Sequence, residues 1–238
     1  MAEKKKHYII ELDNVWKTYK MGEVEVNALR GLNLRVKHGE FVSVMGPSGS
    51  GKSTAMNLIG CLDLPSKGAI YLEGKNIAHL SESALAQIRG KKIGFIFQSF
   101  NLIQTLTAKE NVMLPMIFQG YSAEKRNEAA ERLLKMVDLG ERMDHKPTEL
   151  SGGQQQRVAI ARALSNDPEV ILADEPTGNL DSKSGENIIK LLKKLHRESR
   201  KTVIIVTHDS QIAEHSERIC YLKDGVIFKE KKGSMHEK

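Results

Sequence analysis

The chain has 238 residues, of which 40% are hydrophobic and 28% are charged, and its formal net charge at pH 7 is +6. This composition is ordinary for a globular chain of one α/β domain, alone or with an inserted subdomain. No run of residues reaches the roughly 18 consecutive apolar positions that a transmembrane helix requires. The basic N-terminus also lacks the apolar core and small-residue cleavage site of a signal peptide, so we expect a cytoplasmic protein.

The cysteines, histidines and basic runs exclude only a few classes of function. Cys61 and Cys220 form no CxxC pair, which agrees with a reducing compartment, and the eight histidines show no zinc-binding spacing. Much of the positive charge lies in "KKK" (4–6) and "KEKK" (229–232), which is typical of solvated terminal tails. The net charge could also suit nucleic acid or an anionic membrane surface, but we expect no nucleic acid partner.

The first forty residues are predicted to be β structure. Apolar residues alternate through "YIIELDNV" (8–15) and "VEVNALRGLNLRV" (24–36), with turns at "MGE" and "KHGE". A short buried strand, "FVSVM" (41–45), then leads through glycine into a helix that begins near Lys52. "GAIYLEGKNI" (68–77) has hairpin character, and "KIGFIF" (92–97) is another buried strand.

The second part of the chain begins with a helical pattern. Ser122 is the expected N-cap of a helix whose apolar face comprises Ala129, Ala130, Leu133, Leu134 and Val137. The apolar strands "EVILAD" (169–174) and "TVIIVTHD" (202–209) flank an amphipathic helix around 186–198. The last segment, 218–230, has Asp224-Gly225 at its centre, which predicts a hairpin turn.

Alternation of apolar strands and helices predicts an α/β fold with a parallel sheet covered on both faces. An antiparallel N-terminal β subdomain and an inserted helical subdomain are additions to that core. We expect one domain over residues 1–238, with its core at about 1–98 and 165–230 and the helical subdomain at about 99–164.

A phosphate-binding loop stands between the strand at 41–45 and the helix that follows. "GPSGSGKS" fits G-x-x-x-x-G-K-[ST], the pattern of a P-loop, in which glycines let successive backbone N–H groups point at phosphate oxygens. Lys52 should reach the β- and γ-phosphates, and the Ser53 hydroxyl should bind Mg²⁺. The residues expected to contact the nucleotide are Gly46, Pro47, Ser48, Gly49, Ser50, Gly51, Lys52, Ser53 and Thr54.

Polar residues at the ends of other apolar strands fit the same chemistry, because ligands of open α/β sheets bind at the carboxyl ends of the strands. Asp174 would hold Mg²⁺ through water, and Glu175 would orient and deprotonate a water for attack on the γ-phosphorus. His208 can touch the γ-phosphate from the next strand end. Gln98 is a candidate sensor at the end of the strand at 92–97.

A second helix N-terminus suited to an anion follows about a hundred residues later, in "ELSGGQQQRVAIARAL" (149–164). With it, the chain contains "GPSGSGKST", a glutamine at 98, "LSGGQ", "ILADEP", "NLD" and a histidine at 208, in this order. From about Ile10 to Phe228 the chain therefore resembles the ATP-binding cassette (ABC) ATPases, of which "LSGGQ" is the signature motif.

The resemblance implies that two such domains pair head to tail, with each ATP between one subunit's P-loop and the other's signature helix. Ser151, Gly152, Gly153 and Gln154 would then contact the partner's nucleotide, and the chain would form a homodimer or pair with a homologous subunit. Loss of the γ-phosphate on hydrolysis would open the dimer.

The resemblance also implies roles for residues outside these motifs. Tyr19 would stack on adenine, with Trp16 as the competing aromatic residue, and Asp181 would lie at the dimer interface. Gln98 would sense Mg²⁺ and the attacking water. Residues 99–118 would receive the coupling helix of an integral-membrane permease, which would place the chain on the inner face of the cell membrane.

Longer segments, "FNLIQTLTAKENVMLPM" among them, resemble ATPase subunits of lipoprotein-release, macrolide-export and antimicrobial-peptide-resistance systems. The implied function is MgATP hydrolysis that powers export or mechanical transmission through a permease. Two alternatives remain. One is regulation of a membrane-bound partner, as in cell-division relatives. The other is a DNA-associated ATPase, which is disfavoured because residues 99–150 contain no sustained heptads.

Overall fold

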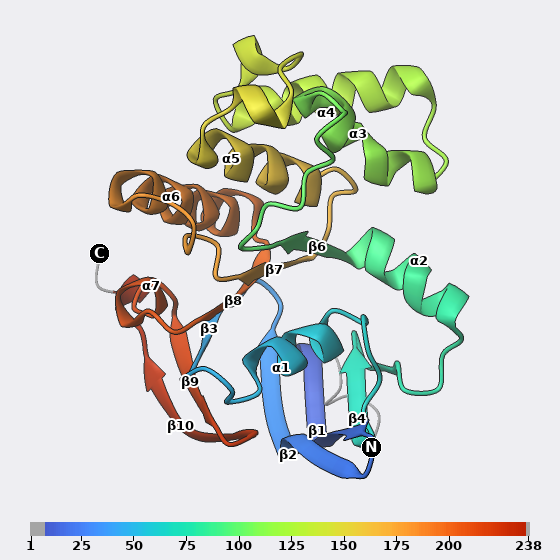
Figure 1. Cartoon of the computed structure of the whole chain (residues 1–238), viewed down its shortest axis with the longest axis vertical. Helices are drawn as coiled ribbons and strands as arrows, with labels where there is room; N and C mark the ends of the chain where they lie inside the picture. The colour runs from blue at the N-terminus through green and yellow to red at the C-terminus, as the bar shows by residue number, and fades with distance from the viewer. Residues whose placement is uncertain (1–7, 237–238) are drawn as a thin grey trace.

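The computed structural model describes residues 8–236, which form two β-sheets and the helices that cover them (Figure 1). The smaller sheet is antiparallel and has the strand order β2-β1-β4-β5. Its strands are β1 (Tyr8–Met21), β2 (Val24–Lys37), β4 (Lys67–Leu72) and β5 (Lys75–Asn76). The expected N-terminal antiparallel β structure is confirmed.

The larger sheet has the strand order β10-β9-β3-β8-β7-β6. Strands β6, β7, β8, β3 and β9 run parallel, and β10 pairs antiparallel with β9 through a hairpin. The expected parallel sheet is therefore confirmed. Its strands are β3 (Phe41–Met45), β6 (Ile93–Ile96), β7 (Val170–Asp174), β8 (Thr202–Thr207), β9 (Arg218–Lys223) and β10 (Val226–Lys232).

Helices cover both faces of this sheet and extend beyond it. They are α1 (Lys52–Ile59), α2 (Glu82–Lys92), α3 (Ala108–Phe118), α4 (Ala123–Met136), α5 (Gly152–Ala163), α6 (Ser182–Ser199) and α7 (Ser210–Ala213). Short 3₁₀ turns occur at Gly140–Arg142, Pro147–Glu149 and Ser234–His236. The sequence pattern did not predict α2, because Leu85 is its one buried side chain and no apolar face marks it.

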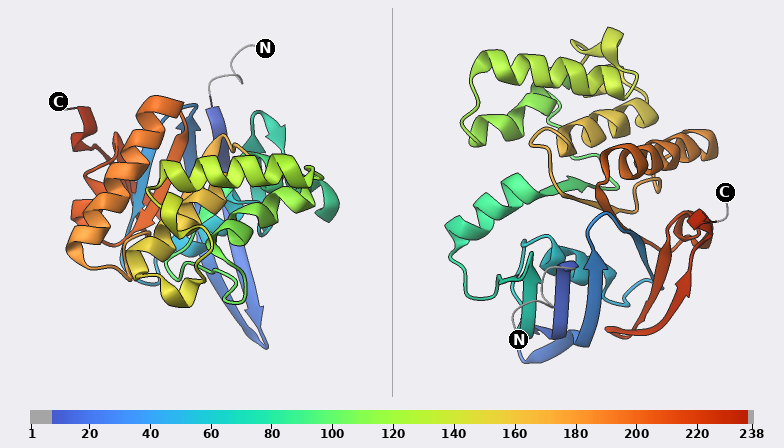
Figure 2. Two further views of the ribbon diagram at one scale, coloured as in Figure 1. Left: turned by 90° about the horizontal axis from the view of Figure 1, so that it is seen from above. Right: turned by 180° about the vertical axis from the view of Figure 1, so that it is seen from behind.

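Strand alternation divides the buried side chains between two cores. In β8, Val203 and Ile205 join one cluster, whereas Ile204 and Val206 join the other. Successive side chains of a strand point to opposite faces, so an all-apolar strand needs cover on both. The antiparallel sheet and α1 cover one face, and α3 to α6 cover the other. Figures 1 and 2 show α3, α4 and α5 together at one end of the molecule. The exact division into subdomains stays a prediction.

The structure tests the prediction of a solvated tail for one of the two basic runs. The "KKK" run at 4–6 lies outside the described residues. The prediction that the run at 229–232 is a solvated tail is wrong, because these residues are part of β10. Their side chains are exposed, but Glu230 pairs with Arg218 (3.0 Å) and Lys231 with Glu214 (2.6 Å). The main chain is held by pairing with β9 while the charges face solvent.

Both cysteines are buried and free. Burial raises the pKa of the Cys61 thiol to about 11 and that of the Cys220 thiol to about 12, so both stay protonated at neutral pH. Within residues 8–236, no helix has the length and apolar character needed to span a membrane.

Asn111 is a fully buried polar side chain that shapes the segment before α3. Its Oδ1 accepts a hydrogen bond from the Ile103 N–H (2.8 Å), and its Nδ2 donates to the carbonyl oxygens of Ile103 (3.1 Å), Leu106 (3.2 Å) and Thr107 (2.9 Å). One amide therefore satisfies the main chain of a loop that has no strand partner of its own.

We expect Asn111→Ala to lower the free energy of unfolding by about 2 kcal/mol, because buried backbone groups lose their partner. Urea unfolding followed by circular dichroism measures the change. The control is Asn127→Ala on the exposed face of α4, which should change stability by less than about 0.5 kcal/mol. Equal unfolding midpoints for the two variants would contradict the structural role of Asn111.

Candidate nucleotide site

The strand ends of the large sheet surround a cleft of about 540 Å³. It lies where β3 passes into α1 and where β7 and β8 end. The residues singled out from the sequence that line it are Ser48, Gly49, Gly51, Lys52, Ser53, Thr54, Gln98, Asp174, Glu175 and His208. Four segments far apart in the chain thus meet at one edge of the sheet, as the topology of a parallel sheet requires.

The loop between β3 and α1 has the conformation of a phosphate cradle. Gly49 and Gly51 have φ of 76° and 100°, which only glycine adopts readily. A side chain at Gly51 would also place its Cβ 2.5 Å from the Ala28 carbonyl oxygen. The N-terminus of α1 begins at Lys52 with no acidic residue in its first turn, so its positive end stays available to an anion.

Lys52 extends over this loop. Its Nζ donates hydrogen bonds to the carbonyl oxygens of Gly46 (2.8 Å) and Pro47 (2.9 Å). The ammonium group therefore lies on the cradle and adds its charge to the loop amides. A bound anion with several negative oxygens fits this donor set.

Asp174 is the last residue of β7 and is half-buried in the cleft. Burial and the neighbouring charge of Glu175 raise the pKa of its carboxyl group, and the charge of Lys52 opposes this rise. This arrangement favours a cation near Asp174, since a positive charge relieves the same repulsion. Mg²⁺ fits the available oxygen donors, which include the Ser53 hydroxyl and the Gln98 amide.

Glu175 is oriented by β8. Its Oε2 accepts a hydrogen bond from the Thr207 hydroxyl (2.9 Å), and its Oε1 accepts one from the His208 N–H (2.9 Å). The same Oε1 lies 2.7 Å from the His208 Nδ1. The carboxylate is therefore held in one position, and the imidazole that was expected near a γ-phosphate lies against it.

Gln98 is held by a loop that follows β7. The Asn179 side chain donates to the Gln98 carbonyl oxygen (2.9 Å), and the Gln98 Nε2 donates to the Asn179 Oδ1 (3.4 Å). A Cβ at Gly178 would lie 2.8 Å from the Gln98 Nε2, so glycine permits this approach. Gln98 thereby connects the cleft to the segment that leads into α3.

The "LSGGQ" residues do not line this cleft. Ser151 is the N-cap of α5: its Oγ accepts from the Gln154 N–H (3.3 Å), and the Gln154 Oε1 accepts from the Ser151 N–H (2.9 Å). Gly152 and Gly153 open the helix, where backbone N–H groups have no partner within the helix itself. Of the two helix N-termini that the sequence marked as suited to an anion, that of α1 lines the cleft and that of α5 does not.

Two further predicted residues also lie outside the lining of the cleft. Asp181 is the N-cap of α6, where its carboxylate accepts a hydrogen bond from the Ser184 N–H (3.0 Å). Hydrogen bonding from the Ser184 side chain and from this N–H lowers the pKa of Asp181. The Tyr19 hydroxyl donates to Asp63 (3.1 Å), and Lys17 lies 5.1 Å from the centre of the Tyr19 ring. Trp16 instead donates from its Nε1 to Asn14 (3.3 Å).

Sequence reasoning missed several residues of the site. Thr207 has no motif of its own, and Asn179 was noted only as part of "NLD", so their contacts with Glu175 and Gln98 were not predicted. One wall of the cleft comes from β2 and from the β9–β10 turn, which were predicted only as a strand and a turn. This wall comprises Val26, Asn27, Ala28, Arg30, Asp224 and Gly225. The Asp224-Gly225 pair predicted the turn, but it did not predict that the turn would lie at the cleft.

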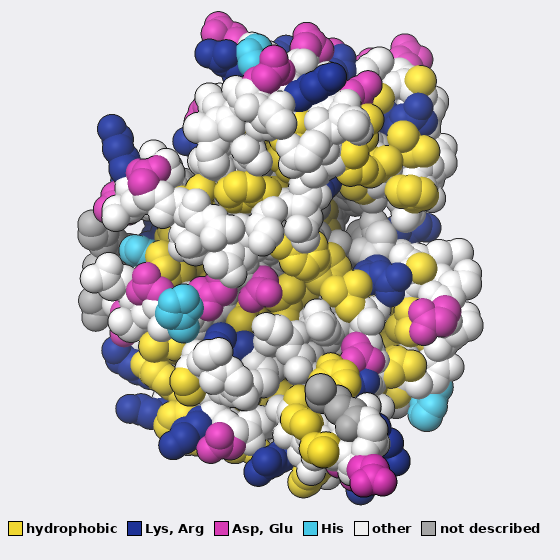
Figure 3. Space-filling view, viewed as in Figure 1, with side chains coloured by type: hydrophobic (Ala, Val, Ile, Leu, Met, Phe, Trp, Pro, Cys, Tyr) yellow, Lys and Arg dark blue, Asp and Glu magenta, His cyan; other side chains and the backbone are white. Residues whose placement is uncertain are grey.

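A larger groove of about 680 Å³ lies away from the cleft, between α2, β6, α3 and α5. Hydrophobic side chains gather between the upper helices and α2 on the face shown in Figure 3. Phe118, at the end of α3, is 79% exposed at this groove. The groove includes part of the segment 99–118 that was expected to meet a permease.

Comparison with known proteins gives a consistent result. A protein-family model described as ABC transporter matches residues 29–178. An uncharacterised ABC transporter ATP-binding protein of Methanocaldococcus jannaschii is 58% identical over 228 residues, which cover 94% of this chain and 97% of that protein. The macrolide export ATP-binding/permease protein MacB of Shewanella sp. ANA-3 is 49% identical over 219 residues, covering 92% of this chain but 33% of MacB.

Solved structures agree with these relatives. A dimeric post-hydrolysis state of an ATP-binding cassette bound to ADP and Pi has a TM-score of 0.87 and 56% sequence identity. The match covers 94% of this chain and 98% of that one. Together with the P-loop, the carboxylates of the cleft and the signature helix, these findings show that the chain belongs to the ABC transporter family and is an ATP-binding, ATP-hydrolysing subunit.

Proposed function

We propose that two copies of this chain, or this chain and a homologous subunit, close head to tail on two MgATP molecules and drive a membrane permease by hydrolysis. The observation that carries the proposal is the separation of the two phosphate-binding N-termini. The α1 N-terminus lines the cleft, whereas Ser151, Gly152 and Gly153 do not. A partner's nucleotide would use the second N-terminus, and the dimeric form of the solved relative supports this arrangement.

In the proposed site, Ser53, Gln98 and Asp174 hold Mg²⁺, which neutralises phosphate charge when bound. Lys52 moves its ammonium group from the loop carbonyls to the β- and γ-phosphates. Glu175, held by Thr207 and His208, orients the attacking water and accepts its proton. The partner's Ser151 to Gln154 segment closes the site from the other side.

The remaining assignments follow the same arrangement. Tyr19 stacks on the adenine ring, and Asp181 lies at the interface between the two subunits. Neither side chain lines the cleft: Tyr19 lies in β1, and Asp181 is the N-cap of α6. Residues 99–164 act as the helical subdomain, and residues 1–98 and 165–230 act as the nucleotide-binding core.

The groove between α2, α3 and α5 is the proposed contact with the permease. It is lined largely by apolar side chains, and Gln98 precedes the segment that borders it. A change at the γ-phosphate would therefore reach the groove through one short connection. This contact would hold the chain at the inner face of the cell membrane, and the name of the MacB relative, which joins ATP-binding and permease functions, supports it.

The transport process we favour is export or mechanical transmission of the lipoprotein, macrolide or peptide type. Affinity purification of tagged Glu175→Gln protein from native membranes with ATP, followed by mass spectrometry, tests it. A permease with a large external domain supports this type, whereas a multi-span import permease contradicts it. A membrane-bound hydrolase would instead support a regulatory role.

We expect Glu175→Gln to bind MgATP, to hydrolyse it at least about 100-fold more slowly and to accumulate as a dimer, because the proton acceptor is lost while the nucleotide contacts remain. Phosphate release and light scattering after size exclusion measure these effects. Glu214→Gln, in a carboxylate bonded to Lys231 outside the cleft, is the control and should behave as the unsubstituted chain. A Glu175→Gln monomer at saturating MgATP would refute the dimer.

We expect Ser151→Arg to keep MgATP binding by the monomer but to abolish dimerisation, since the damage falls in the partner's site. The substitution also removes an N-cap, which costs about 1 kcal/mol. Ser122→Arg, which removes the equivalent cap of α4, controls for that loss and should still dimerise. If nucleotide binding by the Ser151→Arg monomer is lost, Ser151 belongs to its own subunit's site.

We expect Phe118→Asp to abolish co-purification of the permease from native membranes while the purified chain keeps its ATPase activity. A charge on the rim of an apolar groove disfavours docking of an apolar partner segment. Phe228→Asp is the matched control, because Phe228 is 61% exposed on β10, away from the groove. Retention of the permease by Phe118→Asp would place the contact elsewhere.

A further inference from the structure

The Asp224–Gly225 turn of the β9–β10 hairpin reaches the phosphate-binding loop. The Gly225 N–H donates a hydrogen bond to the Ser50 carbonyl oxygen (3.0 Å), and the Gly225 carbonyl oxygen accepts one from the Arg30 N–H (3.1 Å). With both of its backbone polar groups, one residue joins the loop to β2. These three segments are distant in sequence, and all of them border the cleft.

The fit at this junction leaves no room for a side chain. Gly225 has φ of 79°, and a Cβ there would lie 2.8 Å from the Ala28 carbonyl oxygen and 2.9 Å from the Leu29 Cα. At the other end of the loop, a Cβ at Gly46 would lie 2.2 Å from the Leu222 carbonyl oxygen. The main chain of the hairpin therefore packs closely against this region at both ends of the loop.

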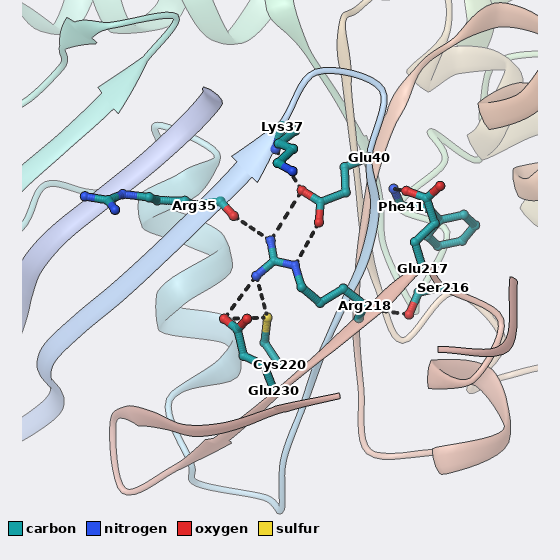
Figure 4. A network of polar contacts seen from close by, with 9 residues as sticks. All are labelled: Arg35, Lys37, Glu40, Phe41, Ser216, Glu217, Arg218, Cys220 and Glu230. Atoms are coloured by element: carbon teal, nitrogen blue, oxygen red, sulfur yellow. Dashed lines mark hydrogen bonds and ion pairs between the residues drawn. The ribbon is translucent and has the colours of Figure 1, made fainter. Parts of the chain in front are cut away.

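The base of the same hairpin is anchored by Arg218, which is half-buried (Figure 4). Its Nε donates to Glu40 (2.8 Å), its Nη1 to Glu230 (3.0 Å) and its Nη2 to the Arg35 carbonyl oxygen. These partners lie on the β2–β3 connection, on β10 and on β2. Since the base is fixed against β2, the turn cannot move without straining the junction with the loop.

We propose that the β9–β10 hairpin positions the phosphate-binding loop for nucleotide, and that Gly225 is the positioning residue. The loop has no ladder of its own, so its N–H groups converge only if neighbours restrain it. Gly225 restrains it at Ser50, one residue before the left-handed Gly51. This inference rests on the proposed binding of MgATP in the cleft, and it assigns part of the affinity to a residue outside the phosphate-binding loop.

The test compares Gly225→Ala with Gly22→Ala. Gly22 has φ of 63° in the β1–β2 turn, and a Cβ there meets nothing within 4 Å, so both variants carry left-handed strain but only one displaces the junction. We expect Gly225→Ala to raise the Kd for MgATP about tenfold through loss of a restraining hydrogen bond, with kcat at saturation largely kept. Gly22→Ala should bind as the unsubstituted chain.

Hydrogen exchange of the unsubstituted chain provides a second test that needs no variant to fold. Nucleotide binding should slow exchange of the Gly225 and Arg30 amides, because coupling between the loop and the turn is reciprocal. Equal MgATP affinity for the two glycine variants, or unchanged protection of both amides with MgADP, would overturn the inference. Failure of the unsubstituted chain to bind MgATP would overturn the proposed site itself.

Discussion

The structure depends on holding a short run of backbone amides in a convergent arrangement that their own loop cannot maintain. The loop between β3 and α1 has no hydrogen-bonded ladder, so its shape comes from what surrounds it. The end of a buried strand, the start of a helix, the main chain of β2 and the Gly225 turn enclose it. The parallel sheet then brings the carboxylates of β7 and the polar end of β8 to the same edge, where their charges act on one cleft.

Much of this fold was predictable because the signals are local. Apolar strands, an N-cap such as Ser122 and the Asp224-Gly225 turn each act within a few residues. Helix α2 was not predicted because Leu85 is its one buried side chain, so no apolar face marks it in the sequence. The charges at 229–232 were misread because composition does not show that the main chain beneath them is paired with β9.

Some residues of the site were likewise predictable from local sequence signals, and others were not. Motif residues at strand ends line the cleft, since strand ends of a parallel sheet share an edge, whereas the "LSGGQ" residues and Asp181 do not line it. Sequence spacing does not predict that Thr207 contacts Glu175 or that Asn179 contacts Gln98, because each pair joins distant parts of the chain. The contacts of Gly225 are still harder to foresee, because backbone groups carry no residue-specific signal.

The two edges of the large sheet affect the tendency of the protein to aggregate in concentrated solution. At one edge stands β6, only four residues long, and at the other stands β10, whose last four residues expose charged side chains. Short strands and charged edges both discourage a sheet from growing into a neighbouring molecule. Strand addition at either edge of the large sheet is thereby disfavoured, so this sheet resists aggregation although its inner strands β3, β7 and β8 are mostly apolar.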